Sequence, residues 1–298
     1  MKKLEEIRIR DPFIVTYEGC YYLYGTMEEQ TTRVVYVHKS IDLENWEGPS
    51  VIYTIDENSW AKNQPWAPEV HKYKGKFYLF VSMMGKDGLR GTEISVADTP
   101  EGPFIPISDR PATPTGQSCI DGTLYVEDGR PYMIYSHDWP DCYHKEEDVY
   151  IGEMWAVELS EDLTHSVGEP FMLFTSKDVP LSGKNPTHCQ RNNQDVIRYG
   201  SDGPFIVKLS DGRPFLLWSP IPGGNYVVLG AVADSIRSEW KHIEPEIFAD
   251  NGGHAMVFTD LSGKRFMSIH WPEIYCHEYA RFIPVYEKDG RLFLEQEV

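Results

Sequence analysis

Short apolar runs separated by turn-forming residues dominate this 298-residue chain. Val, Ile, Tyr, Phe and Trp gather in these runs, and Gly, Pro and Asp separate one run from the next. No long window places apolar residues at the i, i+3, i+4, i+7 spacing that is typical of an amphipathic helix. The pattern therefore predicts an all-β fold.

Five stretches of the chain resemble one another when they are aligned. Each begins with a polar residue beside Pro or Gly, continues through an apolar run, turns at a glycine and returns as a second apolar run. A more polar hairpin follows most of them, which gives four strands per unit, the number in a propeller blade. The stretches are RDPFIVTYEGCYYLYGT from Arg10, APEVHKYKGKFYLFVSM from Ala67, IDGTLYVEDGRPYMIYSH from Ile120, SDGPFIVKLSDGRPFLLWSP from Ser201 and GGHAMVFTDLSGKRFMSIHW from Gly252. We predict a five-bladed β-propeller, with four-stranded antiparallel blades around a central channel and residues 1–298 in a single domain.

Equivalent positions near the start of the five stretches carry titratable side chains. In a propeller the first strands line the channel and begin at one face, so these side chains should converge. A single Asp before Gly or Pro often only forms a turn, but repetition at equivalent positions favours a functional site. Like charges placed this closely repel, so one or more must be protonated or paired. The residues are Asp11, Glu69, Asp121, Asp202 and His254.

The second strand of each hairpin returns to the same face, so its last residues should surround the pocket. His137, Trp139, His270 and Trp271 occupy such positions, and Trp66 precedes the second stretch. Flat aromatic faces suit stacking on sugar rings, although ordinary packing between strands explains each Trp equally well. We expect these five residues, together with Glu69, to contact substrate.

An insertion lengthens the third unit. Residues 177–199 are rich in Asn, Gln, Pro and His and poor in apolar residues. A loop of this kind either closes over a site or is a solvated surface segment, and the sequence leaves both open.

Charge and composition restrict the partners. Lys and Arg number 28 against 46 Asp and Glu, which gives a net charge of −18. This charge repels nucleic acid and anionic membrane surfaces but not a neutral sugar. No apolar run follows Lys2 and Lys3 or is long enough to span a membrane. The five cysteines are widely spaced without a C-x-x-C pair, so we expect reduced thiols and a cytoplasmic protein.

These stretches resemble glycoside hydrolase family 43, the five-bladed propellers that cleave arabinose- and xylose-containing glycans. The resemblance extends over nearly the whole chain. It rests on Arg10-Asp11-Pro12-Phe13, Trp66-Ala67-Pro68-Glu69-Val70, Ile120-Asp121-Gly122, Ser201-Asp202-Gly203-Pro204-Phe205 and Gly253-His254-Ala255-Met256, in this order and at blade spacing.

The resemblance implies an inverting hydrolase with an oligosaccharide substrate. Asp11 would be the general base and a protonated Asp202 the general acid. Asp121, negatively charged, would orient that acid and raise its pKa. Asp202 stands where the family usually has Glu and is one methylene shorter, so Glu69 and Glu169 are alternative proton donors. The implied enzyme requires no cofactor, although His254 would reach a Ca²⁺ ion in the channel, or bind water or a channel residue instead.

Two other functions stay open at this point. A glycoside phosphorylase on the same fold would need cations at the pocket for phosphate, and Arg10, Arg191, His137 and His270 are the candidates. A catalytically impaired sugar-binding propeller is the second, since the expected Glu is replaced by Asp202.

Overall fold

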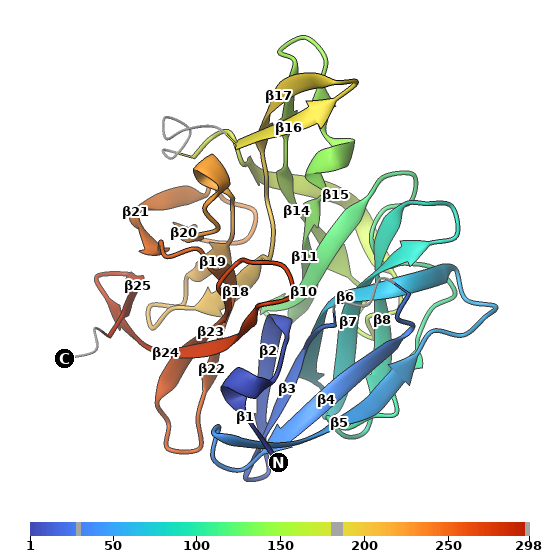
Figure 1. The fold of residues 1–298 in the computed structure, drawn as a ribbon, viewed down its shortest axis with the longest axis vertical. Coiled ribbons are helices and arrows are strands. Elements are labelled where there is room, and N and C mark those ends of the chain that lie inside the picture. Colours follow the sequence, from blue (N-terminus) through green and yellow to red (C-terminus); the bar gives the residue numbers. More distant parts are fainter. Residues whose placement is uncertain (28–30, 180–186, 296–298) are drawn as a thin grey trace.

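The computed structural model describes residues 1–27, 31–179 and 187–295, and most of these residues lie in β-strands (Figure 1). The predicted all-β fold is confirmed. The helical segments among the described residues are single 3₁₀ turns: η1 (Leu4–Glu6), η2 (Trp139–Asp141) and η4 (Pro222–Gly224). Among the described residues no helix is long and apolar enough to cross a membrane.

Five sheets share one plan, in which four strands pair antiparallel in chain order and the strand nearest the centre comes first; in the third sheet β12 (Tyr143–His144) and β13 (Val149–Ile151) intervene between its second and third strands. The first sheet carries the additional strand β1 (Lys2–Lys3) beside β5. The strands are β2 (Arg10–Tyr17), β3 (Cys20–Thr26), β4 (Val34–Ser40) and β5 (Asn45–Thr54); β6 (Ala61–Tyr73), β7 (Lys76–Gly85), β8 (Arg90–Ala97) and β9 (Ile105–Pro106); β10 (Cys119–Glu127), β11 (Arg130–His137), β14 (Glu153–Leu159) and β15 (Ser166–Thr175); β18 (Phe205–Lys208), β19 (Pro214–Trp218), β20 (Val228–Val232) and β21 (Lys241–Phe248); and β22 (Gly253–Thr259), β23 (Arg265–Trp271), β24 (Tyr279–Lys288) and β25 (Arg291–Leu294).

A sixth sheet, which the sequence did not predict, lies at the top of Figure 1. It has the order β12 (Tyr143–His144), β13 (Val149–Ile151), β17 (Gln194–Tyr199), β16 (Thr187–Arg191), and β13 pairs with β17 in parallel. Its strands are short, and the parallel pair joins segments far apart in sequence, so no local pattern predicts it. Part of the predicted insertion 177–199 forms β16 and β17, while residues 180–186 lie outside the described residues.

The first strands of the five sheets contact one another in chain order. β2 packs beside β6, β6 beside β10, β10 beside β18, β18 beside β22, and β22 beside β2 again. Apolar side chains fill the spaces between neighbouring sheets. Leu23 of β3 packs in one cluster with Val81 of β7, and Met154 of β14 packs in another with Trp218 of β19. This arrangement brings the starts of distant strands together.

The predicted hairpin turns are confirmed. In each of the five sheets the first two strands are joined by a turn that contains a glycine with positive φ, a backbone conformation that other residues adopt at a cost. The glycines are Gly19, Gly75, Gly129, Gly212 and Gly263.

Candidate active site

A β-bulge interrupts four of the first strands at the same register. In β2, β6, β10 and β22 two residues oppose one residue of the neighbouring strand. The first of the two has a left-handed backbone, with φ of 50° at Asp11, 43° at Ala67, 57° at Asp121 and 53° at His254. Gly203, with φ of 52°, occupies the corresponding place before β18. Bulges redirect side chains near functional sites, and here they turn two carboxylates and an imidazole out of the strand pattern.

Two of the predicted equivalences are out of register. Ala67, and not Glu69, corresponds to Asp11, because Glu69 pairs with Phe80 beyond the bulge. The Glu69 carboxylate is buried and lies 2.7 Å from Nε2 of His71. In the fourth sheet Gly203 occupies the bulge position. Asp202, which lines the cavity, is the residue before this position. The alignment had matched acidic residue types, which do not reveal where a bulge falls.

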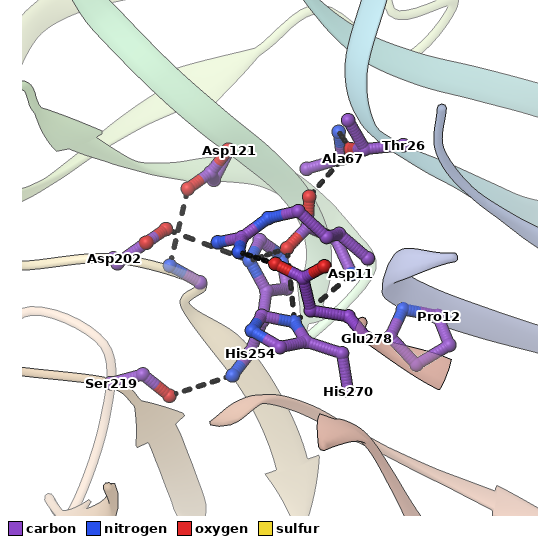
Figure 2. A network of polar contacts seen from close by, with 12 residues as sticks. Asp11, Pro12, Thr26, Ala67, Asp121, Asp202, Ser219, His254, His270 and Glu278 are labelled. Atoms are coloured by element: carbon purple, nitrogen blue, oxygen red, sulfur yellow. Dashed lines mark hydrogen bonds and ion pairs between the residues drawn. The ribbon is translucent and has the colours of Figure 1, made fainter. Parts of the chain in front are cut away.

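A cavity of about 280 Å³ lies where the strand starts meet. It brings together the three predicted catalytic carboxylates, His254 and Trp66. Figure 2 shows the three carboxylates and His254. Its lining residues are Arg10, Asp11, Thr26, Met27, Trp66, Ile120, Asp121, Asp202, His254 and Tyr275. Glu69 is not among the described residues that line it.

Asp11 is the centre of the polar network in Figure 2. Its Oδ2 accepts a hydrogen bond from the Thr26 hydroxyl, and its Oδ1 lies 3.1 Å from Nδ1 of His254 and 3.3 Å from Nδ1 of His270. Burial alone would raise the pKa of Asp11. The charge and hydrogen bond of His254 and the hydrogen bond of His270 outweigh this and hold the pKa well below its usual value. Asp11 is therefore ionised.

His270 supports Asp11 from behind. The sequence placed His270 at the edge of the pocket, but its side chain is fully buried, and its Nε2 lies 2.6 Å from Glu273. Arg10 bridges the same Glu273 and Glu278, at 3.0 and 2.6 Å. No sequence pattern pointed to Glu273 or Glu278, because only the contact between β2 and the sheet of β22–β25 brings them near Asp11.

Asp121 and Asp202 form a pair that shares one proton. Burial and the charge of Asp202 raise the pKa of Asp121 well above its usual value. Burial would also raise the pKa of Asp202, but hydrogen bonds from Asp121 and His254 outweigh burial and lower this pKa below its usual value. Asp121 is buried, whereas the Asp202 side chain is partly exposed, so the deeper residue keeps the proton. This is opposite to the sequence expectation of a charged Asp121 beside a protonated Asp202, because the sequence does not show depth.

His254 lies between the two sides of the site. Its Nδ1 is 3.1 Å from Asp11 and 3.5 Å from Asp202. Burial lowers its pKa, but the Asp11 charge and the hydrogen bonds with both carboxylates raise it well above the usual value. One imidazolium nitrogen thus separates the carboxylates of Asp11 and Asp202.

The residues around His254 do not match the calcium site that the resemblance implied. Asp121, Asp202 and His254 do place donor atoms within 4.8 Å of one another. Calcium, however, takes six to eight oxygen ligands, whereas this set offers carboxyl oxygens from only two residues beside an imidazole nitrogen. No step of the chemistry below passes through calcium.

The remaining predicted substrate residues divide into two groups. Trp66 lines the cavity, and the Arg90 guanidinium covers one of its faces at 3.1 Å from the ring centroid. The others are not among the described lining residues: His137 pairs with Glu153, Trp139 packs edge-on against Tyr150, and Trp271 donates to the Asp250 carbonyl.

Replacing Asp121 by Asn is expected to raise the melting temperature at pH 7 and above, but not near pH 3.5. A carboxyl whose pKa is raised on folding stabilises the protein below its unfolded pKa, about 3.9, and loses this contribution as pH rises through the folded value. Asn imitates the protonated form and tolerates the positive φ. Each kcal/mol recovered would raise the melting temperature by about 2–4 °C.

Thermal melts from pH 3.5 to 8 test this, with Asp128→Asn at an exposed turn as the control. An equal shift at every pH would contradict the protonation of Asp121.

Comparison with known proteins agrees with this geometry. A family model described as glycosyl hydrolases family 43 matches residues 5–211. Xylosidase/arabinosidase 43A of Humicola insolens is 26% identical, and the alignment covers 98% of both chains. The extracellular endo-α-(1→5)-L-arabinanase 1 of Bacillus subtilis is 27% identical over 78% of this chain and 74% of its own. The crystal structure of an endo-arabinase from Bacteroides thetaiotaomicron is 32% identical, covers 97% of this chain and 98% of its own, and superposes with a TM-score of 0.85. The chain belongs to glycosyl hydrolase family 43 and is a glycoside hydrolase.

Proposed function

We propose that this enzyme hydrolyses arabinose- or xylose-containing oligosaccharides with inversion at the anomeric carbon. One observation carries the proposal: an ionised Asp11 faces the singly protonated Asp121–Asp202 pair across one cavity. A base and an acid are thus present together. The names of the relatives support the sugar class, since they include xylosidases and arabinanases.

The geometry supports the following sequence of events. Asp11 takes a proton from a water molecule whose oxygen attacks the anomeric carbon. The bond from that carbon to the leaving oxygen breaks, and the Asp121–Asp202 pair gives this oxygen its proton. Asp202, whose side chain reaches the cavity surface, delivers the proton to the leaving oxygen and receives the proton of Asp121 across their shared hydrogen bond. Solvent then returns the proton from Asp11 to the pair.

Inversion requires room for water between the base and the sugar, and carboxyl separations of about 6.5–9.5 Å are typical of it. His254 keeps the carboxylates of Asp11 and Asp202 from direct contact, since a single nitrogen touches both. Membership of the family, for which the sequence resemblance implied inversion, supports a water nucleophile over direct attack by Asp11 on the sugar.

The five sheets with the shared plan are proposed to be the blades of a five-bladed propeller. Support comes from their first strands, which contact one another in a closed order, and from the repeated hairpin. The sixth sheet is then built from two insertions, β12–β13 between β11 and β14 of the third blade and β16–β17 between β15 and β18. The catalytic cavity lies at the end of the channel where the first strands begin.

Hydrolysis suits the site better than phosphorolysis. Arg10, a candidate phosphate ligand, already binds Glu273 and Glu278. His137 binds Glu153 and Asp141, and Arg191 stacks on a tyrosine ring. The carboxylates in the cavity would also repel a dianion.

A substrate panel tests the proposed function. Nitrophenyl arabinofuranoside, xyloside and galactoside, together with xylo- and arabino-oligosaccharides, are incubated with and without phosphate, and NMR follows the first anomer released. We expect phosphate-independent release of pentose with inverted configuration. Retained configuration would refute the mechanism, phosphate dependence would indicate a phosphorylase, and binding without release would indicate an impaired enzyme.

A further inference from the structure

A second cluster of titratable side chains lies outside the catalytic cavity. His137 ends β11, Cys142 follows η2, and Glu153 opens β14. One ring nitrogen, the thiol sulfur and a carboxylate oxygen of these residues lie within 4.8 Å of one another. The cluster lies at the junction of the third and sixth sheets. The backbone carbonyl of Cys142 accepts a hydrogen bond from the N–H of Ile151 in β13.

Neighbouring groups hold the imidazole and the carboxylate in orientation. Nδ1 of His137 is 2.9 Å from Oε2 of Glu153, and Nε2 is 3.3 Å from Oδ2 of Asp141. The Trp155 indole donates to the same Glu153 oxygen at 2.9 Å. A histidine that binds metal through one ring nitrogen usually donates the other N–H to a carboxylate. His137 has this arrangement, with Nδ1 facing the cluster and Nε2 facing Asp141.

The backbone fixes the cluster as firmly as these hydrogen bonds do. His137 and Glu153 are directly paired across β11 and β14. The thiol of Cys142 lies 3.5 Å from the backbone carbonyl of His137. Ser118 donates its N–H to the Asp141 carboxylate at 2.9 Å, which holds the outer partner of the imidazole. The donor atoms are therefore preorganised by the fold.

We propose that His137 Nδ1, Cys142 Sγ and Glu153 bind a zinc ion, with water as the fourth ligand. Sulfur, imidazole nitrogen and carboxylate oxygen are the three donor types that zinc accepts in tetrahedral sites. Tetrahedral donors lie roughly 3.4–3.8 Å apart, so the side chains need shift by only about 1 Å. The thiol proton passes to solvent when the metal binds.

The cluster is open to a metal from solvent. Cys142 is buried, but the side chains of His137 and Glu153 are 15% and 18% exposed. The ion would join β11, η2 and β14, and so fix the base of the sixth sheet. This is a structural role that does not depend on the proposed reaction.

The test uses the full chain without a histidine tag, stripped with EDTA. Titration with zinc chloride by calorimetry should show one ion per chain. Titration with cobalt(II) should give the thiolate-to-cobalt charge-transfer band, which the carboxylates and His254 of the catalytic cavity cannot produce. Cys142→Ser should remove this band and lower zinc affinity at least 10-fold, whereas the control Cys20→Ser should keep both.

Two further variants test the proposal even if Cys142→Ser fails to fold. Asp141→Asn, which changes only the outer partner of His137, should weaken zinc binding about 10- to 100-fold, and Glu153→Gln should weaken it further. The proposal is overturned if the unmodified chain binds no stoichiometric zinc, if it gives no cobalt–thiolate band, or if the band persists in folded Cys142→Ser.

Discussion

Replacing Asp11 by Asn is expected to lower kcat on xylo- or arabino-oligosaccharides by about 10²–10⁴-fold, the usual contribution of a general base. Asn keeps the shape of Asp and tolerates the positive φ at this bulge, but it cannot accept the proton of the attacking water. Substrate affinity should change little, because the bonds that Asp11 makes to Thr26, His254 and His270 lie within the protein. Steady-state kinetics separates kcat from KM.

The matched control for this change is Asp128→Asn, which alters an exposed carboxyl at the turn between β10 and β11. NMR of the histidine ring protons gives a second readout. Without the Asp11 charge, the pKa of His254 should fall, because that charge is the largest influence raising it. Retained turnover in a variant with this histidine shift would remove Asp11 from the role of base.

Replacing Asp202 by Asn is expected to produce a loss that depends on the leaving group. With a sugar hydroxyl as leaving group, kcat should fall by about 10²–10⁴-fold, since this oxygen needs a proton as it departs. With nitrophenolate, a stable anion, the loss should be much smaller. Comparing nitrophenyl glycosides with the matching disaccharides measures the difference.

Asp211→Asn, at the exposed turn between β18 and β19, is the control for Asp202. Asp202→Glu adds the methylene that the family usually has at this position and should retain a share of the activity. Equal losses on both kinds of substrate would show that Asp202 does not deliver the proton.

Local pattern was sufficient to predict the β-strands and their hairpins. Apolar runs and turn glycines such as Gly19 and Gly129 are short-range signals, and the structure follows them. Repetition of the pattern then pointed to Asp11, Asp121 and His254, because equivalent strands begin at one place. These residues were found without any long-range contact.

The rest depends on features that a single sequence does not carry. The bulge in β6 moved Glu69 out of the cavity, and bulges leave no fixed residue signature. Asp121, rather than Asp202, holds the proton because its carboxyl is more deeply buried. The burial of a side chain depends on tertiary packing, which a single sequence does not show. His270 was placed at the pocket edge from strand direction alone, but the packing of β23 beside β2 buries it behind Asp11.

The contact between β2 and the last sheet has a consequence for biosynthesis. Asp11 is translated well before His254, His270, Glu273 and Glu278. Until β22 and β23 leave the ribosome, the Asp11 carboxylate lacks the imidazolium and the buried ion pairs that keep it charged. The nascent chain is therefore not expected to cleave glycans before the sheet of β22 and β23 docks on β2, so release of sugar reports that this contact has formed.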